Sequence, residues 1–417
     1  MHTLLRVSIV LGLALAPVVG TAAAVSEDEI RELRSQIAAL SARLSELEAR
    51  AGVAAVPAGP PEPVAAAPAA PPAPRGDHWT DRIELRGDFR YRWESIDVEG
   101  SDTRRRQRIR ARPALIADVN DDLEVGFGLA SGGDSPVSSN QTLGGGGSTK
   151  PINLDLAYFA WTGLENTSIL GGKFKRPLRR VGDSSLVWDD DWRPEGLAAT
   201  WDNGTFYGTA LTTWLEADSR VGSERAYALQ AGGNFGLGRD GSLTLSAGYY
   251  DLQVAGREAV YEEAEFFGNS FTPDGRYLYD YQMAELAGEF GFALGDWPVS
   301  LFADYVKNLD ADRFDTGWAV GGTIGKAKDR GSWRVRYVYQ DLEADAVFGL
   351  LTDSNFGGGG TDARGHILSA DYVIAKNWVF RLTYYDNVIG ENAVERGDAG
   401  AAELDYDRLI LDFRFKY

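Results

Sequence analysis

The sequence predicts an all-β fold: a transmembrane antiparallel up-and-down β-barrel of about sixteen strands, preceded by a short coiled-coil helix and a Pro/Ala-rich linker. Segments in which apolar and charged residues alternate with period two recur through residues 79–417. The connections between these segments are alternately short and long. No stretch reaches the ~18 consecutive apolar residues of a membrane helix. A membrane protein without such helices must be a closed barrel, because lipid leaves open backbone groups unsatisfied.

The last thirteen residues, 405–417, show the alternation most clearly. One face is apolar and ends on an aromatic residue: Leu409, Leu411, Phe413, Phe415 and Tyr417. The other face is mostly charged: Arg408, Ile410, Asp412, Arg414 and Lys416. Two such faces indicate a β-strand between two different environments. The pattern resembles the closing strand of bacterial outer-membrane barrels. An amphipathic strand of a soluble sandwich is the alternative, and the other segments decide between the two.

Composition excludes several classes of function. The chain has 417 residues, a formal charge of −19, no cysteine and three histidines. This length is ample for one large domain. The lack of cysteine excludes a disulfide framework and thiol chemistry. The strongly negative charge argues against nucleic acid as a partner.

Residues 1–24 are predicted to be a secretory signal peptide. His2 and Arg6 precede a short apolar run at 7–19, and the small residues at 22–24 offer a cleavage site. The apolar run is too short to span a bilayer. The mature protein is therefore expected to begin near Val25, outside the cytoplasm.

Residues 25–50 are predicted to form a short coiled coil. Ser26 and Glu29 make a capping-box pattern at its start. Apolar residues then repeat at alternating spacings of three and four: Ile30, Leu33, Ile37, Leu40, Leu44 and Leu47. We expect this helix to lie in the periplasm and to mediate self-association, with a single amphipathic helix on the barrel rim as the alternative. Ile at the first and Leu at the second core position favour a dimer in isolation.

Residues 51–78 form the predicted linker. The segment holds eight of the sixteen prolines, and alanine fills most of the positions between them. Such a segment is extended and semi-rigid, at roughly 3.1 Å per residue. The linker separates the coiled coil from the predicted barrel, residues 79–417.

A file of basic residues is predicted to line the barrel interior. In the second strand, 104–118, the alternation places Arg108, Arg110 and Arg112 on one inner row. Closure of the barrel brings the last strand beside the first, so that their basic residues join this row. The predicted basic wall of the lumen consists of Arg86, Arg90, Arg92, Arg108, Arg110, Arg112, Lys173, Lys175, Arg408, Arg414 and Lys416. A nucleic-acid patch and an ordinary surface strand are the alternatives for the arginine-rich run.

The loop lengths predict which end of the barrel faces outward. Short turns alternate with long loops, the short ones including 202–204, 236–241 and 375–377 and the long ones 253–280, 342–365 and 387–404. In outer-membrane barrels the short turns are periplasmic and the long loops external. If the first strand starts in the periplasm, the third external loop is residues 176–195.

This third loop is where candidate functional residues concentrate. We expect it to fold into the lumen and narrow it, with Trp188 and Trp192 as anchors; an outward-facing loop is the alternative. Its charged candidates are Arg179, Arg180, Asp183, Asp189, Asp190, Asp191 and Glu195. The acids are expected to approach from the side opposite the basic wall. Such an arrangement produces a transverse field that orients dipolar solutes, and the basic wall favours anions.

No motif supports catalysis. The glycines 236, 238 and 241 have GxGxxG spacing but lie between two strands with no helix after them, unlike a dinucleotide site. In the barrel region only His366 is available as a histidine base, and it falls on an alternating row with Leu368 and Tyr372. We therefore expect a protein that is not an enzyme, with no catalytic residues, no bound metal and no cofactor.

Three segments carry a family resemblance. RGDFRYRWE (86–94), LDLAYFAW (154–161) and LGGKFKRPL (170–178), with the preceding heptads and linker, resemble the putative porin family of Gram-negative bacteria. They are more distantly similar to sixteen-strand phosphate-selective porins. The resemblance implies a trimeric, water-filled channel, surrounded by outer-membrane lipid, for passive diffusion of small hydrophilic solutes or ions. The competing hypothesis is a structural barrel tethered through its coiled coil to the cell wall or a periplasmic partner.

Overall fold

The structure is a computed structural model, and it describes residues 79–217, 224–262, 265–398 and 400–417. The chain divides into two units, residues 1–74 and 75–417, and the described residues all belong to the second. The predicted signal peptide, the coiled coil with its heptad residues, and the linker lie outside the described residues.

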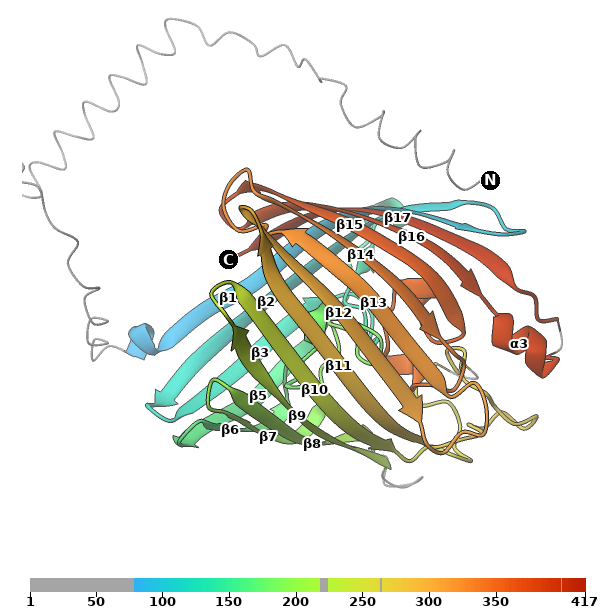
Figure 1. The fold of residues 1–417 in the computed structure, drawn as a ribbon, viewed down its shortest axis with the longest axis horizontal. Coiled ribbons are helices and arrows are strands. Elements are labelled where there is room, and N and C mark those ends of the chain that lie inside the picture. Colours follow the sequence, from blue (N-terminus) through green and yellow to red (C-terminus); the bar gives the residue numbers. More distant parts are fainter. Residues whose placement is uncertain (1–78, 218–223, 263–264, 399) are drawn as a thin grey trace, which may run out of the picture. The chain divides into compact units, whose positions relative to one another are not determined.

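Sixteen long strands form a closed antiparallel barrel (Figure 1). They are β1 (Ile83–Val98), β2 (Arg104–Asn120), β3 (Leu123–Ser131), β5 (Ile152–Leu164), β6 (Thr167–Lys173), β7 (Glu195–Asp202), β8 (Phe206–Glu216), β9 (Glu224–Leu237), β10 (Gly241–Leu252), β11 (Tyr281–Leu294), β12 (Trp297–Asn308), β13 (Thr316–Gly325), β14 (Trp333–Leu342), β15 (Ala363–Ala375), β16 (Trp378–Ile389) and β17 (Leu404–Lys416). A further two-residue strand, β4 (Gln141–Thr142), pairs with β2 from within a loop. The predicted all-β barrel of about sixteen strands is confirmed.

The helices among the described residues are short. They are η1 (Trp79–Arg82), η2 (Gly145–Gly147), η3 (Val181–Asp183), η4 (Gly349–Leu351), η5 (Phe356–Gly358) and α3 (Glu391–Arg396). Within the described ranges, none of the helices has the length and apolar character needed to cross a membrane.

The barrel closes where the last strand meets the first. β1 pairs with β2 on one side and with β17 on the other, so the strands form a ring. The N–H of Gly87 donates to the carbonyl of Tyr417 at 2.9 Å, and the N–H of Tyr417 donates back to the carbonyl of Gly87 at 3.1 Å. Closure leaves neither of these terminal strands with an unpaired edge.

The outer face of the barrel is apolar. Large exposed hydrophobic side chains alternate with inward residues on most strands, and Leu85, Leu229 and Leu286 are about 60% exposed. A soluble protein rarely leaves so continuous an apolar surface in water. Such a belt is the lipid-facing surface expected of a transmembrane barrel.

The two ends of the barrel differ in their connections. The turns between β2 and β3, β5 and β6, and β7 and β8 span only two or three residues. The connections at the opposite end include the long loops 132–151, 174–194, 253–280 and 343–362. The chain enters β1 and leaves β17 at the end with the short turns. The predicted alternation of short turns and long loops is therefore present.

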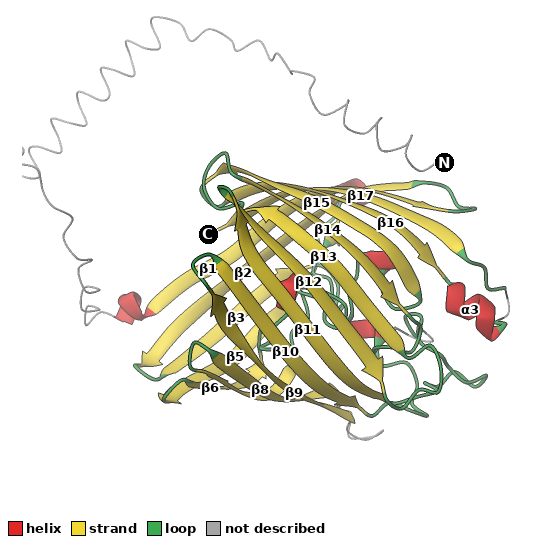
Figure 2. Cartoon of the chain, in the orientation of Figure 1, coloured by secondary structure: helices red, strands yellow, loops and turns green. Residues whose placement is uncertain are grey.

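Loop segments fill part of the barrel interior (Figure 2). Loops 174–194, 253–280 and 343–362 contribute buried apolar side chains, which pack against the inner faces of several strands between β7 and β14. Trp188 stacks on Trp192 with ring centroids 4.7 Å apart, and it meets Tyr250 of β10 edge-on at 5.0 Å. Fully burying an apolar side chain of this size contributes about 1.5–3 kcal/mol. The inner faces of β1, β2 and β14–β17, in contrast, carry many charged side chains.

Candidate functional site

A row of alternating charges crosses five neighbouring strands on the inner face. The strand register places Arg92 of β1, Asp412 of β17, Arg381 of β16, Asp371 of β15 and Arg334 of β14 side by side. Arg92 donates to both carboxylate oxygens of Asp412, at 2.7 and 2.8 Å. Asp371 accepts from Arg381 at 2.5 Å and from Arg334 at 2.8 Å. Each carboxylate therefore neutralises arginines from a neighbouring strand, which makes the row stable in spite of its high charge density.

Glu94 of β1 is the second centre of charge compensation. Its side chain is fully buried and accepts from Arg408 of β17 at 2.6 Å. Arg106 of β2 forms a further ion pair with it, and Arg108 lies 3.7 Å away. The Glu94 carboxylate of β1 thus pairs with arginines on both neighbouring strands, β2 and β17.

Asp191 brings loop 174–194 onto the arginine file of β2. Its carboxylate lies 3.0 Å from Arg110 and 2.7 Å from Arg112. Both arginines also pair with Asp88 of β1, each at 2.8 Å. The predicted placement of this acid across the lumen from the basic wall is therefore wrong: Asp191 is in direct contact with the wall, because two arginines hold it there.

Asp189 ties the same loop to loop 343–362. It accepts from the N–H of Asp191 at 2.6 Å and from the N–H of Ser354 at 2.9 Å. Its own N–H donates to the carbonyl of Leu351 at 2.8 Å. The Thr352 hydroxyl adds a bond to the carbonyl of Leu186 at 2.9 Å. These contacts make the two loops one structural unit.

The two loop carboxylates have opposite electrostatic environments. Burial, reinforced by the charges of Asp191 and Asp353, raises the pKa of Asp189 to about 7. Burial would also raise the pKa of Asp191, but the neighbouring Arg110 and Arg112 outweigh it and hold that pKa below its usual range. Asp191 therefore carries a full charge near neutral pH, whereas Asp189 titrates there.

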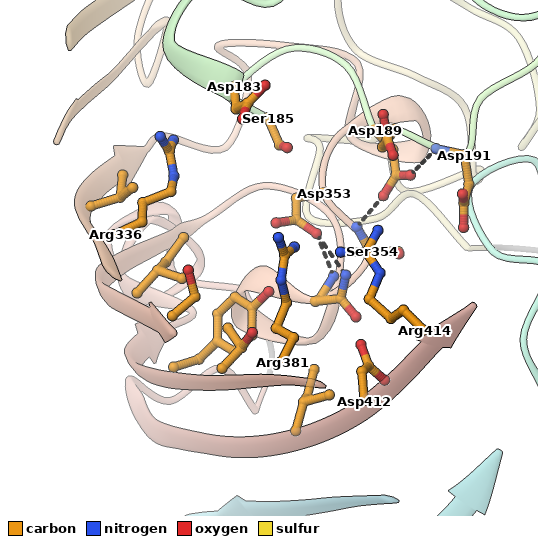
Figure 3. Close-up of a pocket in the computed structure, with 18 of the residues that line it drawn as sticks. Asp183, Ser185, Asp189, Asp191, Arg336, Asp353, Ser354, Arg381, Asp412 and Arg414 are labelled. Atoms are coloured by element: carbon orange, nitrogen blue, oxygen red, sulfur yellow. Dashed lines mark hydrogen bonds between the residues drawn. The ribbon is translucent and has the colours of Figure 1, made fainter. Parts of the chain in front are cut away.

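Two polar cavities adjoin at these loops. The first, of about 510 Å³, is lined by β1, β2 and β14–β17 together with loops 174–194 and 343–362. The second, of about 580 Å³, lies beside β1, β2 and β17 toward the long loops. Both are bounded by Asn140, Ser354 and Asn355. In Figure 3, Arg381 and Arg414 extend from the strands toward loop residues Asp353 and Ser354.

Most of the predicted basic wall gathers at these cavities. Arg90, Arg92, Arg110, Arg414 and Lys416 line the first cavity, and Arg108 and Arg408 line the second. Arg112 lies beside them through its bonds to Asp88 and Asp191. Arg86 is more than half exposed and pairs with Glu84 near the short-turn end of β1. Lys175, just past the end of β6, is exposed and lines neither cavity.

Two predicted residues of the site belong to the outer row of the barrel wall. Lys173, at the end of β6, pairs with Ala157 on the row that also carries exposed Phe159. Its amino group lies 2.6 Å from the carboxylate of Glu195 on β7, whose row carries exposed Leu197. Neither residue lines the two cavities at the basic wall, but both border a third cavity, of about 320 Å³, together with Asp191 and Trp192 of the loop. The inward position next to Lys173 is taken by Phe174, which is 1% exposed, because the interior here is apolar.

The other predicted loop residues divide into two groups. Arg180, Asp183, Asp189, Asp190 and Asp191 all line the first cavity. Arg180 pairs with Asp190 at 3.0 Å, and Asp183 lies 3.5 Å from Arg334. Arg179 instead pairs with Asp202 and lies over the ring of Tyr207, 4.0 Å from its centroid.

Sequence reasoning missed several residues of this site. They are Asp88, Glu94, Arg106, Arg334, Arg336, Asp353, Asn140, Asn355, Asp371 and Arg381. The charges of β14–β16 stand at alternate positions of their strands, as in Arg334 and Arg336, and this signal could have placed them on the inner face. No periodicity could have predicted that the side chains of Asn140 and Asn355 point into the lumen, because both residues lie in long loops.

Groups capable of other chemistry are sparse in the described residues. His366 bonds through Nδ1 to the hydroxyl of Tyr337 at 2.8 Å, and its ring lies against Tyr339. No group of three or more histidine, aspartate or glutamate side chains is arranged to hold a metal ion within the described ranges.

Comparison with solved structures finds barrels of the same kind. Pseudomonas putida OprB matches with a TM-score of 0.53 and 13% identity, over 80% of this chain and 94% of that chain. A triple mutant of Rhodopseudomonas blastica porin matches with a TM-score of 0.46 and 12% identity, over 80% of this chain and all of that chain. At this level of identity the OprB match supports the fold alone.

Comparison with protein sequences gives the family. No curated protein sequence matches the chain. A family profile described as "Putative porin" matches residues 98–273 and 279–415, which include most of the barrel strands and both cavity-lining loops. The chain therefore belongs to the putative porin family of outer-membrane barrel proteins.

Proposed function

We propose that this protein is a passive diffusion channel for small hydrophilic solutes and ions, narrowed by loop 174–194, with a preference for anions. The observation that carries the proposal is the charge of the first cavity. Nine basic side chains and six carboxylates line it, although the whole chain has a formal charge of −19. Local charge, rather than net charge, determines the potential that a permeating ion experiences.

The contacts of loop 174–194 support the narrowing. The loop leaves β6, and its residues then touch Gln230 of β9, Phe302 of β12 and Arg110 of β2. These strands lie in different parts of the ring, so a loop that reaches all of them crosses the interior. The remaining polar passage then runs between the loops and the charged strands β1, β2 and β14–β17.

Reversal potential in a salt gradient tests the ion preference. In planar bilayers the natural protein should pass anions more readily than cations. Replacing Arg110 and Arg112 by Gln leaves Asp88 and Asp191 without their partners, and the preference should move toward cations. Asp191→Asn should move it toward anions. A unit charge about 10 Å from the ion changes its energy by roughly 1 kcal/mol in this partly aqueous setting, so a several-fold change in permeability ratio is expected.

Salt dependence and a matched control complete the test. The shifts should be largest at low ionic strength, because salt screens charges in a water-filled lumen. Arg330→Gln makes the same charge change on an exposed residue of the β13–β14 turn and should leave the reversal potential unchanged. A protein that conducts but keeps one reversal potential in all the lumen variants contradicts the proposed preference.

The assembly and the amino-terminal segment belong to the same proposal. We infer a homotrimer in the outer membrane, with the heptad residues of 25–50 in the periplasm assisting association, and the mass of the detergent-solubilised complex tests it. The tether hypothesis requires a barrel that serves only as an anchor. The charged cavities favour the channel, and absence of any conductance in purified, folded protein would support the tether.

A further inference from the structure

Three arginines lie side by side in a second row of the barrel wall. The register pairs Arg90 of β1 with Arg110 of β2 on one side and with Arg414 of β17 on the other. Like charges directly opposite each other on neighbouring strands are unfavourable. Arg110 is neutralised by Asp88 and Asp191. The other two arginines of the row, Arg90 and Arg414, are not neutralised in this way.

Arg90 and Arg414 lack carboxylate partners. No carboxylate of the described residues lies within ion-pair distance of either guanidinium, and both line the 510 Å³ cavity. Arg90 is only 8% exposed. Its one side-chain hydrogen bond goes to the Asn140 amide oxygen, and its Nε is buried without a partner. A buried cation that is unpaired in this way is costly unless a counter-charge is supplied.

The nearest carboxylates are already used. Asp412 is held by two of the three guanidinium nitrogens of Arg92, and Asp191 is held by Arg110 and Arg112. The oxygens of Asp189 accept from two backbone N–H groups. Asp353 also lines the cavity, but its recorded hydrogen bonds are with the backbone and side-chain N–H groups of Asn355. Among the described residues no carboxylate pairs with Arg90 or Arg414, so an anion from the solution can supply their counter-charge.

We propose that Arg90 and Arg414 form a binding site for small oxyanions, of carboxylate or phosphate type, within the channel. The inference rests on the proposed function, because the site lies on the proposed permeation path. Guanidinium groups bind such anions by charge-assisted, often bidentate hydrogen bonds. Hydroxyl groups of Ser185, Ser354 and Thr383 line the same cavity and can donate to further oxygens. Dianions gain the most from two adjacent cations, whereas neutral and cationic solutes gain nothing.

The arrangement in Figure 3 fits a ligand that bridges wall and loops. Arg414 extends from β17 toward Ser354, and Arg381 extends from β16 toward Asp353. An oxyanion between Arg414 and the loop unit would meet cations on the strand side and hydroxyl and backbone groups on the loop side. Occupancy of the cavity by such an anion should hinder the passage of small ions.

Block of ion current by added anions tests the site. Chloride current through the full-length protein in planar bilayers should fall in a saturable way as malonate or inorganic phosphate is added. Glucose, a neutral solute, and choline, a cation, should give no saturable block. Arg90→Gln and Arg414→Gln should each weaken the block at least tenfold, and Arg330→Gln on the exposed β13–β14 turn should not change it.

The outcomes separate the site from the channel. Block by malonate alone assigns the site to carboxylates, block by phosphate alone assigns it to phosphates, and block by both assigns it to oxyanions in general. A protein that conducts with an anion preference but shows no saturable block keeps the proposed function and overturns the site. Block that persists at full strength in both arginine variants also overturns it, and circular dichroism of the variants confirms that they are folded.

Discussion

Asp189 is the residue whose charge state couples the two lumen loops. It is 5% exposed and holds N–H groups from loops 174–194 and 343–362. Its pKa of about 7 lies above that of an aspartate in an unfolded chain, which is about 3.9. The stability that it contributes is therefore fully present below pH ~4 and is lost as the pH rises through 7.

Thermal unfolding in detergent measures this dependence. The unfolding temperature of the natural protein should decline between about pH 4 and pH 7, because in this range the unfolded chain releases the Asp189 proton, whereas burial near Asp191 and Asp353 keeps it bound in the folded state. Asp189→Asn keeps the size and removes the titration, so the decline should be smaller. Asp296→Asn, on the exposed β11–β12 turn, serves as the control and should follow the natural protein. Identical pH profiles for all three proteins would contradict the assignment.

Single residues also show where alternation failed as a guide. The segment at 169–175 predicted Lys173 as a lumen residue, but it lies on the outer row. The glycines at 171 and 172 carry no side chain that would have shown which row of this strand faces inward. The outcome depends on Phe174, which enters the apolar part of the interior. That part exists only because loops pack there, and strand periodicity contains no information about such packing.

At the scale of elements, the seam between β1 and β17 is a strongly charged contact of the wall, with ion pairs between Arg92 and Asp412 and between Arg408 and Glu94. The sequence predicted that these strands adjoin and that their basic residues share one wall. It could not predict the partners, because Arg92 and Asp412 meet only through a register between strands at opposite ends of the barrel sequence. The result is a compensated network with two uncompensated arginines, rather than a uniformly basic wall.

Among the carboxylates of this seam, Glu94 should be the one whose substitution lowers the stability of the barrel most. Glu94→Gln keeps the shape of the side chain but leaves Arg106 and Arg408 without a counter-charge in a buried setting. Loss of one partner from a buried ion pair costs about 3–5 kcal/mol. Denaturant unfolding in lipid vesicles should show a loss of this order.

Glu84→Gln on the same strand is the matched control. Glu84 pairs with Arg86, but both side chains are more than half exposed. Exposed pairs of this kind contribute about 0–1 kcal/mol. Equal losses for Glu84→Gln and Glu94→Gln would show that burial of the network does not govern its contribution.

Another element-scale difference concerns the strands from β7 to β14. On several of these strands the expected charged inner face is replaced by small and apolar residues, such as Ala226 and Ala228 of β9. Neighbouring Tyr227 and Leu229 are exposed on the outer face, so this strand is apolar on both sides. The weakened alternation was a sign that the interior is filled at this place. Which loops fill it depends on tertiary contacts, such as those of Phe348 with Tyr277 and Tyr281.

For the whole molecule, the closed sixteen-strand architecture could be read from periodicity and loop length. Lipid outside and water inside impose a two-sided pattern on every strand, and the pattern survives in the sequence. The long loop 342–365 was expected to be external, yet Asn355 within it reaches the inner Arg92. Asn140, in the long loop after β3, likewise reaches Arg90. Loop composition gave no indication of this, because the same glycine-rich segments suit an exposed loop equally well.

Closure of the ring gives the last prediction, at Tyr417. Its backbone bonds to Gly87 in both directions, and a Cβ placed on Gly87 would lie 2.6 Å from the Tyr417 ring. The aromatic side chain therefore covers a glycine at the seam. Tyr417→Lys removes this cover and places a charge on the outer row. Near the membrane interface that charge costs only about 0–1 kcal/mol once the barrel is inserted.

The effect should therefore fall on assembly more than on the stability of the finished barrel. We expect Tyr417→Lys to lower the amount of folded protein in the outer membrane several-fold, while Tyr417→Phe, which keeps the ring, gives the natural amount. The fraction of heat-modifiable protein in isolated outer membranes measures this yield. Gly87→Leu should resemble Tyr417→Lys, because its side chain displaces the ring from the other strand. Natural yields for both would mean that the ring at the seam has no part in closing the barrel.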